Sequence, residues 1–146
     1  MKTKTKKVYL ETERQFEFVD ITSMVEEIVE ESGVSNGSLT VFAPHTTGAI
    51  AINHNEPMLL QDIMRVLYKL VPVEERYSHD MFELSKHNKS DGRSNGHSHC
   101  KSILLGTSEI VPIEKGEMLL GQKQSIFFVE LDGGRKRDFI VQVMGE

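Results

Sequence analysis

The sequence has little or none of several residue types and patterns, and each shortage excludes a class of protein. It contains no tryptophan and a single cysteine, Cys100, so no internal disulfide can form. A chain without disulfides is typical of a reducing compartment. No apolar run approaches the roughly 20 residues that cross a bilayer, and none of signal-peptide length follows the basic N-terminus. We therefore expect a cytoplasmic protein without a membrane partner.

The charge of the chain has the wrong sign for a nucleic-acid-binding protein. The formal net charge is -5, and acidic and basic residues are intermixed without forming a basic stripe. A basic face is the usual mark of nucleic-acid binding, so no nucleic-acid partner is expected. The 146 residues, 38% of them hydrophobic, suit a single globular domain over residues 1–146.

Two segments show the apolar spacing of amphipathic helices. In the first, the apolar residues fall at i, i+3, i+4, i+7 and i+8: Ile21, Met24, Val25, Ile28 and Val29. Asp20 is the expected N-cap and Gly33 the expected stop. The second helix begins at 55–57, where a proline stands in the first turn, and runs to about residue 70. Its expected buried stripe consists of Leu59, Ile63, Val66, Leu67 and Leu70.

The other patterned segments predict strands. Residues 8–19, broken near 11–13, and the short segments 39–43 and 49–53 have the alternation of extended chain. Further strands are expected near 97–105, 109–113, 117–120, 125–131 and 137–144. The polar stretch 71–96 has no clear pattern, and a loop this long is usually functional. The sequence therefore predicts an α+β fold, mostly an antiparallel β-sandwich with one or two helices.

Residues 95–101, Asn-Gly-His-Ser-His-Cys-Lys, are the first source of candidate functional groups. Alternate side chains of a strand share a face, so His97, His99 and Lys101 would lie together and Cys100 would face the core. Two such histidines could hold zinc with a third ligand from elsewhere. Alternatively, the three side chains could hold a phosphate, or the histidines could be ordinary exposed residues. The candidates for a third zinc ligand are His45 and His87.

Two further polar breaks lie near the middle of the chain. At 44–48 the sequence Pro-His-Thr-Thr-Gly separates two strands, and the hydroxyls of Thr46 and Thr47 with free N–H groups could hold an oxyanion. The alternative is an ordinary turn in which the threonines cap local amides. Asn53 and Asn55 lead into a helix N-terminus, which favours anions, although Asn55 could simply be an N-cap.

A charged turn joins the last two predicted strands. Its sequence at 132–137 is Asp-Gly-Gly-Arg-Lys-Arg. Such a turn is usually solvated, but Arg135 directly follows the glycines and could reach an anion with its bidentate guanidinium. Arg135 is therefore a candidate phosphate-binding residue.

Taken together, these motifs make the chain similar to the YjbQ family, also called UPF0047. The similarity is carried by Pro-His-Thr-Thr-Gly-Ala at 44–49 and Ile-Asn-His-Asn-Glu-Pro at 52–57. It continues in Asn-Gly-His-Ser-His at 95–99, Lys-Ser-Ile-Leu-Leu-Gly at 101–106, and Ile-Phe-Phe-Val-Glu-Leu-Asp-Gly-Gly-Arg at 126–135. The resemblance covers nearly the whole chain, and members of the family are called secondary thiamine-phosphate synthases.

The resemblance implies an antiparallel β-sandwich with one or two helices, assembled as a homotrimer. It also implies a pocket that holds His45, His97 and His99 and that could lie at a subunit boundary. The implied activity is the condensation of hydroxymethylpyrimidine diphosphate with thiazole phosphate, which releases diphosphate and is a secondary activity in this family.

In that reaction the protein has to neutralise the leaving diphosphate and hold the two reactants in line. His45, His97 and His99 are the expected catalytic residues, and magnesium would enter with the diphosphate. The expected substrate- or phosphate-binding residues are Thr46, Thr47, Asn53, Asn55, His87, Lys101 and Arg135. One alternative is a metal-dependent phosphoester hydrolase with zinc on the three histidines. The other is a trimeric, non-enzymatic module that binds a phosphorylated metabolite.

Two departures from the family pattern affect this expectation. The family usually has Gly-Thr-Trp-Gln before the Ile-Phe strand, whereas this chain has Gly-Gln-Lys-Gln at 121–124. A stacking role of that tryptophan is therefore missing here. The family's Asp-Gly-Pro-Arg turn has become Asp-Gly-Gly-Arg at 132–135, which we expect to loosen the turn that aims Arg135.

Overall fold

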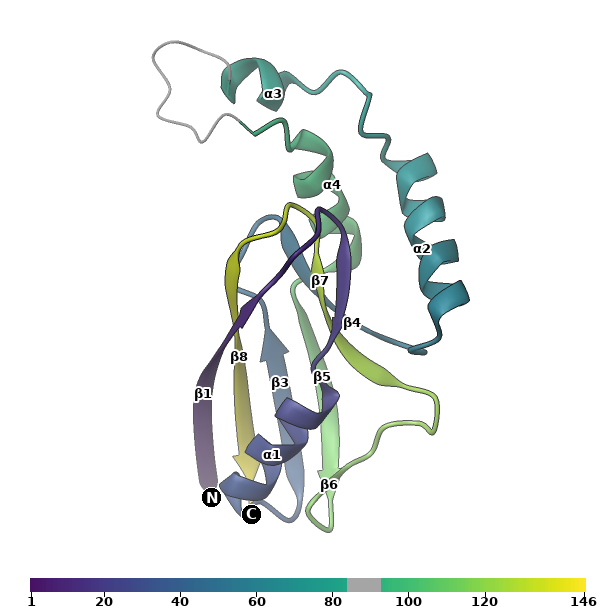
Figure 1. Cartoon of the computed structure of the whole chain (residues 1–146). Coiled ribbons are helices and arrows are strands. Elements are labelled where there is room, and N and C mark those ends of the chain that lie inside the picture. The colour runs from purple at the N-terminus through teal and green to yellow at the C-terminus, as the bar shows by residue number, and fades with distance from the viewer. Residues whose placement is uncertain (84–92) are drawn as a thin grey trace.

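The computed structural model describes residues 1–83 and 93–146. The described residues form twelve elements in two layers of sheet with helices around them (Figure 1). In chain order these are β1 (Lys2–Glu11), β2 (Glu17–Asp20), α1 (Thr22–Ser32), β3 (Gly37–Phe42), β4 (Gly48–Asn53), α2 (Pro57–Leu70), α3 (Ser78–Glu83), α4 (Gly96–Leu105), β5 (Ser108–Glu114), β6 (Glu117–Met118), β7 (Ser125–Glu130) and β8 (Lys136–Gly145).

The strands form a five-stranded sheet in the order β1-β8-β3-β5-β6 and a three-stranded sheet in the order β2-β7-β4. Every strand pair is antiparallel. The predicted α+β fold with antiparallel sheets is therefore confirmed, and α3 and α4 are helices that the sequence patterns did not predict. No helix in the described ranges is long and apolar enough to cross a membrane.

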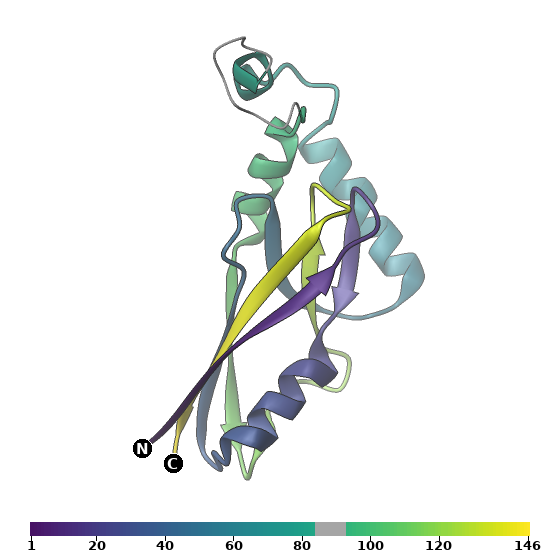
Figure 2. The same ribbon diagram turned by 60° about the vertical axis from the view of Figure 1, so that its left-hand side comes forward.

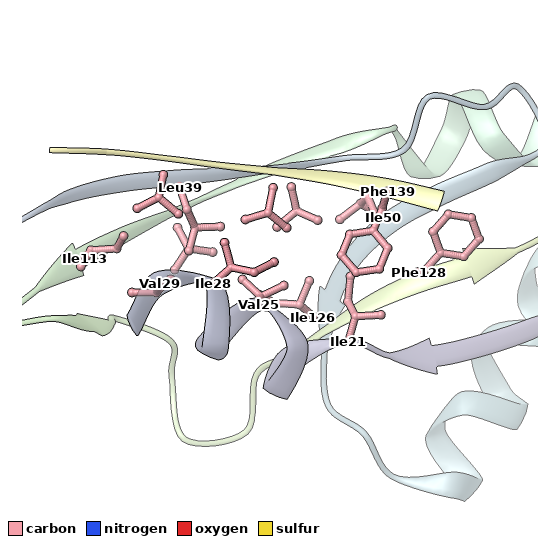
Figure 3. Close-up of a cluster of buried hydrophobic side chains, with 14 of the residues drawn as sticks. Ile21, Val25, Ile28, Val29, Leu39, Ile50, Ile113, Ile126, Phe128 and Phe139 are labelled. Atoms are coloured by element: carbon pink, nitrogen blue, oxygen red, sulfur yellow. The ribbon is translucent and has the colours of Figure 1, made fainter. Parts of the chain in front are cut away.

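The main core lies between α1 and the two sheets (Figure 3). The predicted apolar stripe of α1 points into it except for Met24, which is exposed. Gly33 ends the helix with a φ of +69°, a conformation that glycine adopts without strain. Each large apolar side chain that is fully buried contributes about 1.5–3 kcal/mol of transfer free energy. The core side chains labelled in Figure 3 are Ile21, Val25, Ile28, Val29, Leu39, Ile50, Ile113, Ile126, Phe128 and Phe139.

Helix α2 stands at the outside of the molecule and is less buried than its apolar stripe predicted. Of that stripe, Leu67 alone is buried, whereas Leu59 and Ile63 are half-buried. Val66 and Leu70 are exposed, so the expectation of a fully buried stripe is wrong for a single chain. The helix start was placed correctly, but Glu56 is the N-cap, because its carboxylate accepts a hydrogen bond from the Leu59 N–H at 2.7 Å.

The predicted strand near 97–105 is wrong, because these residues form α4. The face that α4 turns toward the sheets is polar and small, which is why the apolar pattern misled. Ser98 Oγ donates to the carbonyl of Leu131 at 2.5 Å, and Ser102 Oγ donates to the carbonyl of Gly48 at 2.8 Å. The short helix α3 packs beside the start of α4, where Asp80 Oδ1 accepts a hydrogen bond from the Gly96 N–H.

Helices α3 and α4 lie at one end of the sheets, together with the β3–β4 connection and the β7–β8 turn (Figure 1). The two chain ends lie at the opposite end, where β1 and β8 run side by side (Figures 1 and 2). Three segments that are distant in sequence therefore meet at the end of the molecule that bears α3 and α4.

Candidate functional site

An open pocket of about 500 Å³ lies at this end of the molecule. Its wall combines imidazoles, guanidinium groups and hydroxyls, and no aspartate or glutamate of the described residues belongs to it. A second cavity of about 480 Å³ lies between α1 and the segment 116–124, but its ionisable wall residues are acidic. We therefore take the first pocket as the candidate site. It is lined by Pro44, His45, Thr46, Thr47, His79, Asn95, His99, Arg135 and Arg137.

His45 is oriented by the last strand of the large sheet. Its Nε2 lies 2.8 Å from the backbone carbonyl oxygen of Asp138. A carbonyl only accepts hydrogen bonds, so this contact requires the proton on Nε2, whereas the Asp138 N–H at 3.4 Å from the same nitrogen would require a lone pair there. The shorter contact favours the tautomer with the proton on Nε2. The Oδ1 atom of Asp138 lies 3.0 Å from the same nitrogen but without hydrogen-bond geometry, and it has no other partner among the described residues. The His45 ring also packs edge-on against Phe128.

His79 and His99 pack edge to face in the pocket wall. Their ring centroids are 4.7 Å apart, with an interplanar angle of 75°. His99 was a predicted site residue, whereas His79 was missed because it lies in the unpatterned stretch 71–96. A usable signal was Ser78 with Asp80 two residues later, which is typical of a helix start. Nε2 of His79 is 2.9 Å from Oδ1 of Asn95.

Arg137 is held in the wall by a buried ion pair with Glu130. Nε and Nη2 of Arg137 contact Oε1 and Oε2 of Glu130 at 2.8 and 2.6 Å. Nη2 also donates to Thr47 Oγ1 at 2.8 Å. Burial raises the pKa of Glu130. Hydrogen bonds from Arg137, Thr12 and the Asp132 N–H lower it by more than burial raises it, so the pKa lies below its usual value. Arg137 was also missed, although its alternation with Phe139 places it on the inner face of β8.

The turn that carries Arg135 is tightly held, in contrast to the loosening expected from Gly134. Thr12 exchanges backbone and side-chain hydrogen bonds with Arg135, each about 3.0 Å long. The Gly133 N–H donates to the carbonyl of Gln15. A Cβ at Gly134 would lie 2.4 Å from the carbonyl oxygen of Thr12, so the chain has no room for a side chain there. Arg135 therefore enters the pocket from a fixed turn.

The predicted cluster of His97, His99 and Lys101 does not exist, because the segment is helical. Residues two apart lie on nearly opposite sides of a helix, whereas residues four apart are neighbours. His97 and Lys101 are buried away from the pocket wall, with Nδ1 and Nζ 2.8 Å apart. Burial lowers the pKa of both groups, and the nearby Lys101 lowers that of His97 further. Cys100, expected in the core, is exposed.

The remaining predicted residues divide between the pocket and other parts of the chain. Thr46 and Thr47 line the pocket as predicted. Asn53 and Asn55 do not, and Asn55 instead donates to Asp20 at 2.8 Å near the start of α1. His87 lies outside the described residues.

The described residues contain no group of three or more histidine, cysteine, aspartate or glutamate side chains placed to hold a metal ion. The predicted zinc set of His45, His97 and His99 is not assembled, since His97 does not line the pocket. The wall has instead the donors that an anion requires, with guanidinium groups from two positions of the β7–β8 hairpin.

The fold and site define a small α+β protein with a basic pocket at one end of two antiparallel sheets. The chain belongs to the UPF0047 family, described as YjbQ-like, whose family model matches residues 6–146. It is 44% identical to a UPF0047 protein of Methanothermobacter thermautotrophicus, covering 100% of this chain and 95% of that protein. It is 34% identical to the UPF0047 protein YugU of Bacillus subtilis, covering 96% and 98%.

The fold agrees with solved structures of similar proteins. A YbjQ-like protein of Sulfolobus solfataricus superposes with a TM-score of 0.90 at 36% identity, covering 99% of each chain. A protein of the yjbq/upf0047 family from Clostridium acetobutylicum superposes with a TM-score of 0.84 at 37% identity, covering 95% of this chain and 99% of that one.

Proposed function

We propose that this protein is a thiamine-phosphate synthase-like transferase whose pocket binds the diphosphate of hydroxymethylpyrimidine diphosphate. The observation that carries the proposal is the composition of the pocket wall. The described residues contribute two guanidinium groups, three imidazoles and two threonine hydroxyls to it, but no carboxylate. Phosphate and diphosphate groups are recognised by this set of donors. The resemblance of the motifs to secondary thiamine-phosphate synthases supplies the reaction.

The arginines keep donors available for such a ligand. Arg137 uses Nε and Nη2 for Glu130 and Thr47, and its Nη1 takes part in no hydrogen bond of the described residues. Arg135 is 37% exposed and contacts Asp132 through a single long interaction of 3.4 Å. Carboxylates therefore orient both guanidinium groups but leave N–H donors on each of them for a ligand. Donors that are oriented before the ligand binds are typical of a preorganised anion site.

In the proposed reaction, the bond between the pyrimidine methylene carbon and the diphosphate oxygen breaks, and the electron pair leaves with the diphosphate. The ring nitrogen of thiazole phosphate then donates its lone pair to that carbon. Arg135 and Arg137 stabilise the charge that develops on the leaving oxygen, and magnesium entering with the diphosphate would supply further neutralisation. His45 and His99, which line the same wall, are placed to hold or transfer a proton at the phosphate oxygens.

The proposed assembly is a cytoplasmic homotrimer, and its interface has to come from apolar residues that a single chain leaves exposed. The apolar run Ile-Phe-Phe-Val at 126–129 is completely buried within one chain, so it offers no face to a partner. Several exposed apolar residues lie on the five-stranded sheet, and six others lie on α2 and α4. These six are Met58, Val66, Tyr68, Leu70, Ile103 and Leu104. A trimer that covers some of them would remove the apolar exposure of these two helices.

The test is a thiamine-phosphate synthesis assay on the wild type, Arg135→Gln, Arg137→Gln and the control Arg65→Gln. Arg65 is exposed on α2 in a pair with Asp62, so its replacement changes the net charge without touching the pocket. Each pocket variant should lose about a hundredfold in turnover, because it removes a donor aimed at developing charge. The control should retain the wild-type rate.

Other outcomes favour the rival functions. Binding of inorganic diphosphate in calorimetry without turnover would contradict the transferase and favour a binding module. Turnover of a phosphoester that requires added zinc would favour the hydrolase. Equal activity in all four proteins would refute the pocket as the site of reaction.

A further inference from the structure

A chain of hydrogen bonds runs from the pocket to a buried carboxylate at the base of the β7–β8 turn. Nε2 of His79 contacts Oδ1 of Asn95 at 2.9 Å, and Nδ2 of Asn95 donates to Oδ2 of Asp132 at 2.9 Å. Asp132 is 2% exposed. It also accepts hydrogen bonds from Arg93 and Arg135 at 3.3 and 3.4 Å. Neither Asn95 nor Asp132 was a predicted site residue.

The chemistry of this chain fixes the direction of each hydrogen bond. A carboxylate that lies between two guanidinium groups is an acceptor, so Asn95 must turn its amide nitrogen toward Asp132. The amide oxygen of Asn95 then faces His79, and an amide oxygen only accepts. Nε2 of His79 must therefore donate, which places the ring proton on Nε2 and the lone pair of the neutral ring on Nδ1.

We infer that His79 is a further functional residue of this pocket, held with Nε2 protonated by the positioning residues Asn95 and Asp132. The inference deepens the proposed function, and it rests on that function only for the role of His79 toward a phosphate ligand. Asp132 also contacts Arg135, so one buried carboxylate orients both an imidazole, through Asn95, and a guanidinium of the pocket wall. A ligand held by both groups is thereby bound against a common anchor.

This arrangement has a consequence for the pocket wall. Because Asn95 and Asp132 fix the Nε2 hydrogen bond of His79, the ring keeps one tautomer and one orientation where it lines the pocket.

The test is nuclear magnetic resonance of the full chain labelled with ¹⁵N at histidine, recorded without ligand. Long-range proton–nitrogen correlation identifies which ring nitrogen carries hydrogen, and His79→Gln assigns the signals. The wild type should show a slowly exchanging proton on Nε2 of His79, which should be lost in Asn95→Ala. The matched control is Asn36→Ala, at the opposite end of the sheet, where Asn36 accepts from the Lys115 N–H. The control should keep the signal.

Two further variants keep the inference falsifiable if Asn95→Ala does not fold. Asn95→Ser is a smaller change that removes the same amide and should also abolish the protected proton. Asp132→Asn should retain it, because the new amide oxygen can still accept from Asn95. A proton found on Nδ1 in the wild type, or one on Nε2 that survives loss of the Asn95 amide, would overturn the inference.

A separate titration with inorganic diphosphate distinguishes this inference from the proposed function. If the hydrogen-bond chain His79–Asn95–Asp132, here called the relay, orients a phosphate-binding group, Asn95→Ala should weaken diphosphate binding. The expected loss is about tenfold, the equivalent of one hydrogen bond of about 1.4 kcal/mol. Asn36→Ala should not weaken it. If the wild type binds no diphosphate while the Nε2 proton is present, the proposed function fails and the positioning relay stands. Equal diphosphate affinity in wild type and Asn95→Ala would overturn the role of the relay in binding.

Discussion

The ion pair of Glu130 and Arg137 gives the most quantitative prediction for this fold. The Glu130 side chain is 0% exposed and that of Arg137 is 4% exposed. Besides Arg137, the carboxylate accepts hydrogen bonds from the Thr12 hydroxyl and from the Leu131 and Asp132 N–H groups. Breaking a buried pair by removing one partner typically costs about 3–5 kcal/mol, because the other charge stays buried.

The remaining contacts decide where each variant falls in that range. In Arg137→Met, Glu130 keeps three donors, so we expect a loss near the lower end, about 3 kcal/mol. In Glu130→Met, Arg137 keeps Thr47 as a partner, but the Asp132 N–H loses its acceptor, which adds about 1 kcal/mol or more. We therefore expect a loss of about 4 kcal/mol for this variant.

The double variant tests the reasoning, because it contains neither charge. Its cost is limited to the unpaired Asp132 N–H, about 1–3 kcal/mol, because the Thr12 hydroxyl still donates to the carbonyl of Arg135 at 3.1 Å. We expect the double variant to lose at least about 2 kcal/mol less than the sum of the two single variants. The assay is urea unfolding followed by circular dichroism at one protein concentration. Additivity within about 0.5 kcal/mol would refute the account of Glu130 and Arg137 as a coupled buried pair.

Three further predictions concern other parts of the chain. His97 has a pKa lowered chiefly by burial, so below the ordinary histidine pKa of 6.5 the unfolded chain binds more protons than the folded one. The free energy of unfolding should therefore fall as the pH drops from about 7 to 5, and urea unfolding of His97→Gln should show a smaller fall. Gly33→Ala should lower stability by about 1 kcal/mol, because φ is +69° there; an unchanged melting temperature would contradict this. Ser102→Ala should cost about 1 kcal/mol in denaturant unfolding, because the carbonyl of Gly48 loses its buried donor, whereas Ser38→Ala, at an exposed position, should cost little.

Much of the fold could be predicted because the apolar residues of its helix α1 and of several strands recur with the usual helical or strand spacing. Most of the stripe of α1 and the alternation in β3, β5 and β8 follow directly from which side chains reach the core, and the continuous apolar run of β7 follows from its burial on both faces. Helix α4 could not be predicted in this way, because its burial is the reverse of its hydropathy. Its serines and the pair of His97 and Lys101 are buried, whereas Ile103 and Leu104 are exposed. The spacing of apolar residues cannot predict a helix whose buried face is held by hydroxyl groups.

The candidate site was predicted in part for a related reason. His45, Thr46, Thr47, His99 and Arg135 lie in motifs with unusual local composition, and the structure brings all of them to one pocket. The other contributors stand in ordinary contexts. Their position becomes evident only from the tertiary contacts that draw α3, α4 and the β7–β8 hairpin together. These residues are His79, Asn95 and Arg137.

The attachment of Thr12 to the β7–β8 turn links ligand occupancy to the N-terminal part of the chain. The Thr12 N–H donates to the carbonyl of Arg135, and the Thr12 hydroxyl bridges Arg135 and Glu130. A ligand that binds the pocket only while the Thr12 hydrogen bonds to the β7–β8 turn are formed stabilises that state by RT ln(1 + [L]/Kd). The free energy needed to break the Thr12 hydrogen bond rises by the same amount. Hydrogen exchange of the Thr12 amide, measured by mass spectrometry, should therefore slow as the pocket fills. This amide can report the affinity of any candidate metabolite, whether or not the protein converts it.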